Sequence, residues 1–224
     1  MKHLCLVLLI AVSASNAAVP RGALSGSRED GAGIRTVVPS DSIAFENDYL
    51  KVMRNSTACA RAHSPNFGSR VIVALGNVKI KSSRGSMTLK RGKIAVFQAN
   101  ESYKSVTGDY FEVAFKTNHP PVKGPEQWLE PGKNTMVYED DQFRVFEERL
   151  PPHGERQLHS HAQRLVVRLN EVQLTDPRIS EKGTPGAGIQ VPNTVKFAEP
   201  IIHVVRNLSD IPLFNIVIEF KVRH

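Results

Sequence analysis

The chain has 224 residues, of which 41% are hydrophobic and 23% are charged, so it is long enough for one large or two small globular domains. The formal net charge of +7 would suit acidic partners, but Lys and Arg are spread along the chain and form no dense block. Because no nucleic-acid-binding motif accompanies them, the composition argues against a nucleic-acid-binding protein.

The first 18 residues have the pattern of a secretory signal peptide. A basic start precedes the apolar run 4–12, and small residues at 13–17 suit cleavage after Ala17 or Ala18. This run is too short to span a bilayer, and no other segment has the roughly 18–20 continuous apolar residues that a spanning helix needs. We therefore expect a protein that is secreted or exported to the periplasm and has no membrane anchor after cleavage.

Residues 19–42 are rich in Gly, Ser and charged side chains and show little periodicity, so we expect a flexible leader there. After this leader, short segments rich in Val, Ile, Phe and Thr alternate with Gly, Asn, Asp and Pro at intervals that suit hairpins. No long window has the apolar spacing of a helix. These patterns predict an all-β protein.

The chain repeats itself. Three pairs of segments share a pattern and follow one another in the same order: 45–53 (FENDYLKVM) and 138–146 (YEDDQFRVF), 70–78 (RVIVALGNV) and 164–172 (RLVVRLNEV), 113–116 (VAFK) and 217–221 (VIEFK). Such self-similarity predicts two copies of one unit, residues 43–117 and residues 137–224. The Pro-rich segment 118–136 is the expected connector, because dense prolines interrupt helix and sheet alike.

Three segments have the Asn-X-Ser/Thr form of a glycosylation acceptor. They begin at Asn55, Asn100 and Asn207. These patterns matter only in a host that has the glycosylation machinery.

Two histidines at alternating positions give the clearest candidate site. His159 and His161 are separated by one residue, so on a β-strand both imidazoles point to the same side. A third imidazole from a neighbouring strand would complete a metal-binding face, and His203 is the candidate for it. The second unit is therefore predicted to carry a metal site.

These motifs resemble those of the cupin superfamily. Segment 151–161 (PPHGERQLHSH) is similar to the opening of the family's first motif, a glycine and a spacer before His-x-His, with Asn170 at the later turn. His203 and Asn207 match the His and Asn that end the second motif. The resemblance implies two tandem cupin-like jelly-roll barrels, a bicupin, across residues 43–224.

The second unit departs from the family pattern in one ligand. The acidic ligand of the first motif would fall at Leu165 or Val166, and neither side chain can bind a cation. His159, His161 and His203 would then hold Zn, Mn, Fe, Ni or Cu as three neutral ligands and leave positions for water or substrate. A divalent ion held this way keeps its double charge and favours an anionic ligand or a metal-bound hydroxide.

The first unit lacks these histidines. The repeat places Pro65, Phe67 and Tyr103 where the second unit has its three imidazoles. We therefore expect the first barrel, residues 43–117, to be free of metal.

Further residues are candidates for orienting a substrate. Gln163 falls on the same strand face as the histidines if that strand is regular, Glu155 lies just before them, and Arg168 follows on the next predicted strand. Residues 147–149 (EER) are expected to form an exposed strand edge or a local ion pair.

Three functions fit the sequence. The first is a metal-dependent oxygenase, isomerase or hydrolase that acts on a small molecule, with an anion favoured by the charge of the metal. The second is a protein that binds a sugar, a phenolic compound or another small anion without turnover, and the third is a structural cupin with a relic metal site that serves mainly as a homodimer interface. The sequence leaves the three open, because a fold resemblance does not settle activity.

Overall fold

The computed structural model describes four stretches of the chain: residues 42–54, 67–125, 132–175 and 187–222. Every regular element within them is a β-strand, which confirms the all-β prediction. These stretches contain no helix that is long and apolar enough to cross a membrane. The predicted signal peptide, nearly all of the predicted leader, and Pro65 and Asn55 lie outside the described residues.

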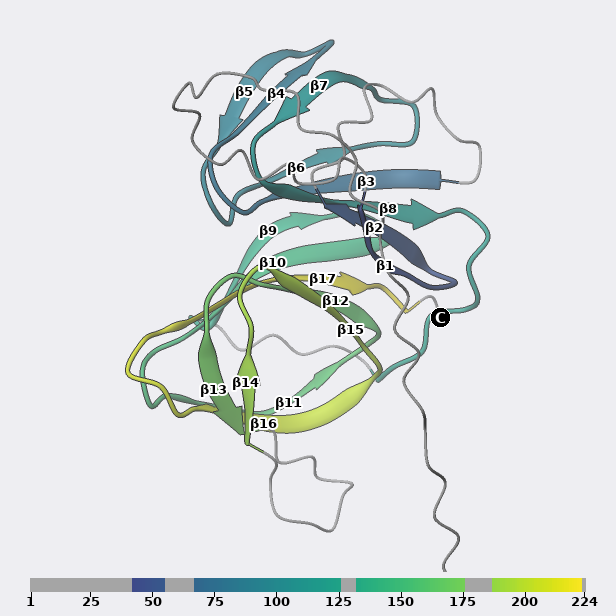
Figure 1. The fold of residues 1–224 in the computed structure, drawn as a ribbon. Helices are drawn as coiled ribbons and strands as arrows, with labels where there is room; N and C mark the ends of the chain where they lie inside the picture. Colours follow the sequence, from purple (N-terminus) through teal and green to yellow (C-terminus); the bar gives the residue numbers. More distant parts are fainter. Residues whose placement is uncertain (1–41, 55–66, 126–131, 176–186, 223–224) are drawn as a thin grey trace, which may run out of the picture. The chain divides into compact units, whose positions relative to one another are not determined.

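The strands of the first unit form two antiparallel sheets (Figure 1). These strands are β1 (Ser42–Glu46), β2 (Leu50–Arg54), β3 (Phe67–Ala74), β4 (Val78–Ser82), β5 (Gly85–Leu89), β6 (Ile94–Phe97), β7 (Tyr103–Thr107) and β8 (Tyr110–Lys116). The five-stranded sheet has the order β1-β2-β8-β3-β6, and the three-stranded sheet has the order β5-β4-β7.

The strands of the second unit form two sheets of the same kind. These strands are β9 (Asn134–Glu139), β10 (Phe143–Leu150), β11 (Glu155–His161), β12 (Arg164–Arg168), β13 (Val172–Thr175), β14 (Ala187–Gln190), β15 (Thr194–Ala198), β16 (Ile201–Asn207) and β17 (Leu213–Phe220). Their orders are β15-β12-β17-β10-β9 and β11-β16-β13-β14.

The sequence repeat is also a structural repeat. Strands β1, β2, β8, β3 and β6 of the first five-stranded sheet correspond in turn to β9, β10, β17, β12 and β15 of the second. The register agrees as well, because Leu50 pairs with Phe115 in the first sheet as Phe143 pairs with Phe220 in the second. The prediction of two tandem cupin-like barrels is confirmed.

The two five-stranded sheets contribute to one apolar core. Along each strand, alternate side chains point to the same face, so a run of Val, Ile and Leu at every second position buries one whole face. Fully buried members of this shared core come from both sheets: Val52, Val71, Val113, Val145, Leu165 and Ile218. The ring of Phe115 stacks on that of Phe143, with centroids 4.3 Å apart.

The interiors of the two barrels differ in polarity. The first barrel contains an apolar cluster of Ile72, Ala74, Val78, Ile80, Ala95, Phe97, Tyr103, Val106 and Tyr110. The second barrel has a smaller cluster of Leu150, Val172, Val205 and Leu213. Its other buried side chains include Arg156, His159, His161, His203, Asn207 and Asn215. Because buried polar groups cost free energy unless they are paired or bind a ligand, the second barrel is the candidate for a functional site.

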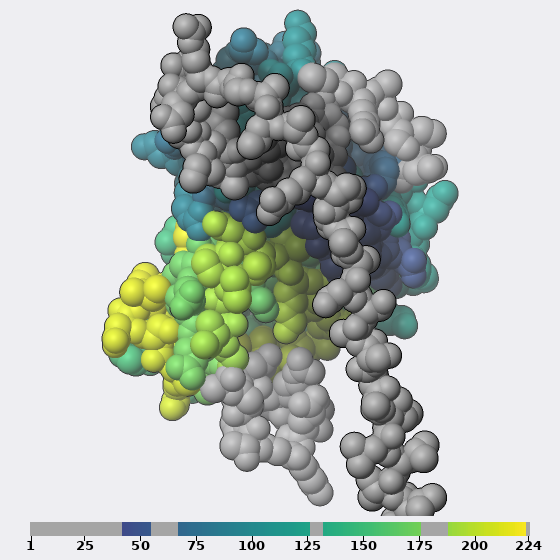
Figure 2. Space-filling view, viewed as in Figure 1, coloured from purple at the N-terminus to yellow at the C-terminus, as the bar shows by residue number. Residues whose placement is uncertain are grey.

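The outer face of the β11-β16-β13-β14 sheet meets solvent. Leu158, Ile189 and Ile202 on this face are half or more exposed. Figure 2 shows atoms of the second unit, coloured green to yellow, at the surface of the molecule. Substitutions on this face therefore serve as controls for changes in the interior.

Asn207 fixes the loops around the end of β16. Its side-chain amide donates hydrogen bonds to the carbonyls of Pro151 and Ile211 at 3.1 and 2.8 Å, and its Oδ1 accepts one from the N–H of Ser209 at 3.0 Å. The residue is fully buried, so an enzyme that glycosylates folded protein cannot reach this side chain. By contrast, Asn100 is exposed.

We expect Asn207→Ala to lower the free energy of unfolding by about 2–4 kcal/mol, because it removes several hydrogen bonds made by one fully buried side chain. Urea denaturation measures the loss. Asn100→Ala is the matched control, and its effect should stay within about 0.5 kcal/mol. Equal stability of the two variants would contradict the role given to Asn207.

Candidate metal centre

Three histidines meet inside the second barrel. His159 and His161 lie on β11, and His203 lies on the neighbouring strand β16, where it is the register partner of His159. The three side chains are only 2–5% exposed. One ligand atom from each lies within 4.8 Å of the other two, so the structure brings the three predicted histidines to one point.

Hydrogen bonds on the far side of two rings fix how they face this point. Nδ1 of His159 is 2.7 Å from the carbonyl oxygen of Gln157, and Nδ1 of His161 is 3.3 Å from Oε1 of Glu219. A proton on each Nδ1 leaves the lone pair on Nε2. Metal-binding histidines are commonly held by such bonds to a carbonyl or a carboxylate.

One ring nitrogen of this group is buried without a hydrogen bond. Nε2 of His159 makes none within the described part of the chain, although it is shielded from solvent. A buried polar atom without a partner costs free energy, whereas coordination of a metal ion would satisfy it. The donor set, with its neutral imidazoles and buried Nε2, therefore fits a divalent metal such as Zn, Mn, Fe, Ni or Cu.

The surroundings keep two of the imidazoles neutral. Burial and, to a smaller extent, the nearby Arg156 guanidinium lower the pKa of His159 to about 4. Burial and Arg164 hold the pKa of His161 well below its ordinary value. Since a cation and a proton compete for the same lone pair, the low pKa leaves both rings unprotonated and able to coordinate a metal ion at neutral pH.

The low pKa of these histidines predicts acid sensitivity of the metal-free protein. The unfolded chain takes up a proton at each histidine near pH 6.5, whereas folded His159 takes one up only near pH 4. The free energy of unfolding should therefore be constant above pH 6.5 and fall as the pH drops towards 4. The slope is at most about 1.4 kcal/mol per pH unit for each histidine.

Urea denaturation at pH 7, 6 and 5 in the presence of a chelator measures this dependence. Burial raises the pKa of Glu219, so the contribution of this carboxylate to the free energy of unfolding grows as the pH falls and opposes that of the histidines. The slope of the wild-type protein should therefore be compared with the slope of His159→Gln. That variant should show a shallower slope. A wild-type protein whose stability does not change between pH 7 and 5 would contradict the assignment.

A cavity of about 110 Å³ opens beside His161 and His203. Its charged lining consists of Glu148, Arg164, Arg168 and Lys196, and its uncharged polar lining consists of Gln190 and Asn215. The lining carries three cationic side chains and one carboxylate. A small space with this charge favours a small anion.

Arg168 is the one predicted substrate-orienting residue that lines this cavity. Gln163 lies between strands, because β11 ends at His161 and β12 begins at Arg164, so the regular strand on which its predicted place depended is absent there. Its Nε2 donates to Glu199 at 3.0 Å. Its Oε1 accepts the backbone N–H of the connector residue Lys123.

The structure also places Glu155 away from the cavity. Its side chain is 44% exposed and pairs with Arg206 on the neighbouring strand β16. Glu155 and Gln163 therefore have structural partners, and neither is among the residues that line the cavity.

A carboxylate that the sequence analysis missed faces the cavity. Glu147 and Arg149 form the expected local ion pair at 3.0 Å. Glu148, which we expected at an exposed edge or in that pair, instead binds Arg156 and accepts a hydrogen bond from Nδ2 of Asn215 at 2.9 Å. Although burial raises the pKa of Glu148, Arg156 and Asn215 outweigh burial and lower it to about 2.

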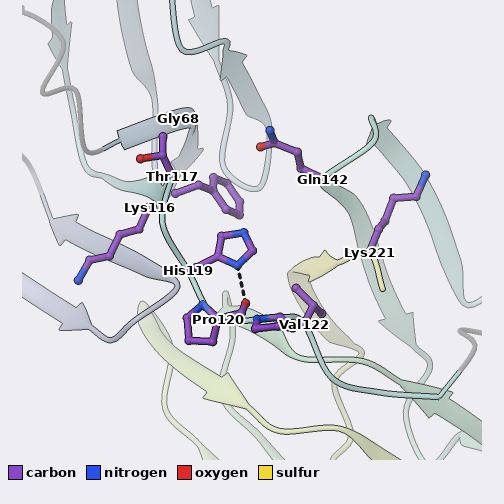
Figure 3. A pocket seen from close by; sticks show the side chains of 10 residues that line it. Gly68, Lys116, Thr117, His119, Pro120, Val122, Gln142 and Lys221 are labelled. Atoms are coloured by element: carbon purple, nitrogen blue, oxygen red, sulfur yellow. Dashed lines mark hydrogen bonds between the residues drawn. The ribbon is translucent and has the colours of Figure 1, made fainter. Parts of the chain in front are cut away.

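The structure has a larger cavity of about 560 Å³ (Figure 3). Its described lining shares no residue with that of the first cavity. The larger cavity lies where the end of β8 and the connector meet Gln142 and Lys221. Nδ1 of His119 is 2.7 Å from the carbonyl oxygen of Pro120. Its described lining has one histidine and neither a carboxylate nor a thiol, so these residues offer no cluster of metal ligands.

Comparison with known proteins gives the fold. No family model matches the sequence, and no curated protein matches it. Among solved structures, a cupin 2 conserved barrel domain protein from Leptotrichia buccalis has 13% identity and a TM-score of 0.52, over 81% of this chain and 88% of that chain. At this identity the likeness shows the cupin fold and leaves the activity open.

Two other solved structures are more distant in shape. A cupin domain protein from Bordetella pertussis Tohama I has 21% identity and a TM-score of 0.37, over 47% of this chain and 99% of that chain. The oxalate decarboxylase of Bacillus subtilis, described with Mn(II) centres, has 14% identity and a TM-score of 0.47, over 79% of this chain and 70% of that chain.

Proposed function

We propose that this chain, a protein of the cupin fold with two barrels, binds one divalent metal ion in its second barrel and acts there on a small anionic molecule. The observation that carries the proposal is the convergence of His159, His161 and His203 within 4.8 Å of one another in a buried site. Three imidazoles leave coordination positions for water or substrate. We further propose that the protein is exported, on the basis of the signal-peptide pattern of residues 1–18.

The charges around the site support an anionic ligand. Arg164, Arg168 and Lys196 line the cavity together with a single carboxylate, Glu148. A bound divalent ion would add two positive charges and supply either a Lewis acid or a metal-bound hydroxide. In this arrangement Arg168 attracts and orients the anion.

Binding without turnover is the second candidate. The one carboxylate in the described cavity lining is not poised to accept a proton at neutral pH, because Arg156 and Asn215 hold the pKa of Glu148 at about 2 although burial raises it. An efficient general base has a pKa near the working pH. The cavity therefore favours either chemistry carried by the metal or simple binding over general-base catalysis by Glu148.

Thermal unfolding with small ligands tests the proposal. Acetate and malonate should stabilise the Zn-loaded protein, whereas the uncharged acetamide and malonamide should not. An anion present at about 100 times its Kd should stabilise the folded protein by roughly 2.7 kcal/mol. Arg168→Met should reduce the shift with the anions. Equal shifts with amides and acids, or shifts that do not depend on the metal, would overturn the proposal.

A further inference from the structure

We infer that Glu148 supplies, from strand β10, the negative charge that the first histidine motif lacks at Leu165 and Val166, and that it thereby sets the metal affinity of the three-histidine site. The inference rests on the proposed function, because it concerns the same metal ion. It adds a residue that neither histidine motif contains.

The site needs a negative charge because cations surround it. Three neutral imidazoles leave the double charge of a metal ion uncompensated. Arg156 is fully buried and Arg164 is 7% exposed, so solvent screens their charges weakly. Arg164 lines the cavity beside His161 and His203, and Arg156 binds Glu148 in the same lining. The fields of these two cations would repel a metal ion.

Glu148 is the one carboxylate in the described lining of the cavity that His161 and His203 share. Its side chain is 12% exposed. Its negative charge lies in the wall of the cavity beside His161 and His203, so it attracts a cation bound there and opposes the arginines.

Hydrogen bonds hold Glu148 in place on two sides. Arg156 donates to Oε1 and Asn215 donates to Oε2. Oδ1 of Asn215 in turn accepts a hydrogen bond from Nε2 of Gln190 at 2.8 Å. With both oxygens engaged, Glu148 acts through its charge across the cavity, and the direct ligands are the three histidines.

Glu219 has a different role from Glu148. Its Oε1 accepts the N–H of Ala162 at 2.7 Å and lies 3.3 Å from Nδ1 of His161. Its Oε2 lies 3.4 Å from the guanidinium of Arg144, which compensates its charge. Glu219 therefore positions the ring of His161 from behind, whereas Glu148 faces the cavity.

Zinc titration of the full chain against a chromophoric chelator tests the inference. Glu148→Gln should weaken zinc binding by about 10- to 100-fold, the range typical of groups that support a metal site from outside it. Glu147→Gln is the matched control on the same strand, because it removes the same charge from a side chain paired with Lys93 and Arg149. Its zinc affinity should stay within about threefold of wild type, since exposed partners screen this charge.

Two further variants distinguish an electrostatic role of Glu148 from a purely structural one. Glu148→Asp keeps the charge and should bind zinc far more tightly than Glu148→Gln. Arg156→Gln removes a buried cation and should strengthen zinc binding. A purely structural ion pair predicts instead that both Glu148→Gln and Arg156→Gln weaken binding, and that result would overturn the inference.

The outcomes also distinguish this inference from the proposed function. If the wild-type protein binds no zinc, the proposed function fails. If it binds zinc and Glu148→Gln matches Glu147→Gln, only the role of Glu148 fails. Should Glu148→Gln not fold, as judged by circular dichroism, Arg156→Gln still decides the matter, because the inference predicts tighter zinc binding by this variant and a structural ion pair predicts weaker binding.

Discussion

Replacing His203 by alanine is expected to reduce the bound metal from about one ion per chain to nearly none, because a structural or catalytic zinc site needs at least three protein ligands. The residue is 5% exposed and is the register partner of His159. Elemental analysis of protein without a histidine tag, loaded with zinc and dialysed, measures the change. An unfolded variant would be recognised by circular dichroism of the metal-free protein.

His153→Asn is the matched control for this experiment. His153 is exposed, pairs with Asp210, and has a positive φ of 55°, which asparagine tolerates. The His153→Asn variant should keep the full metal content. Zinc at 100 times its Kd should also stabilise this variant by roughly 2.7 kcal/mol, as it does the wild-type protein. If His203→Ala and His153→Asn retain equal amounts of zinc, the three-histidine site is wrong.

Phe143→Ala is expected to lower the free energy of unfolding by about 3–5 kcal/mol. The side chain is fully buried in the core shared by the two five-stranded sheets, and its ring stacks on Phe115 at 4.3 Å. Truncation removes this aromatic pair and leaves a cavity that the surrounding strands fill only in part. Urea denaturation followed by circular dichroism measures the loss.

Ile189→Ala is the control for the core substitution. Ile189 is 66% exposed on the outer face of the second barrel, so its truncation should cost no more than about 0.5 kcal/mol. A shared core also predicts that the two barrels unfold together. A cost below about 1 kcal/mol for Phe143→Ala would show that the stacked pair contributes little to stability.

The repeat and the alternation of side chains were enough to predict the two barrels. Leu50 and Phe143 begin equivalent strands, and the paired positions Phe115 and Phe220 follow in equivalent registers. The spacing of His159 and His161 likewise placed two imidazoles on one face, because the period of a strand is two residues. These features depend on local periodicity, which a sequence displays directly.

The end of β11 could not be predicted in the same way. Gln163 was expected on the histidine face, but the strand ends at His161 and the N–H of Ala162 donates to the side chain of Glu219. Glu219 is distant in sequence, and a single sequence does not reveal which distant group meets a given N–H. The position of Gln163 therefore depends on tertiary contacts.

Glu148 was missed although the sequence held a signal for it. Phe146 and Leu150 are both fully buried, and Glu148 lies between them at the same strand period. Alternation along β10 therefore points Glu148 towards the barrel interior. The charged run 147–149 instead predicts an exposed strand edge or a local ion pair, because charged residues are rarely buried without partners. The partner, Arg156, lies on another strand.

X-ray absorption spectroscopy of the zinc-loaded protein is the most direct test of the metal centre. We predict three imidazole nitrogens at about 2.0–2.1 Å from the ion, with water or an added anion completing the coordination. The signal of three imidazoles should disappear in His203→Ala. A zinc ion bound by fewer than three imidazoles in the wild-type protein would contradict the central claim.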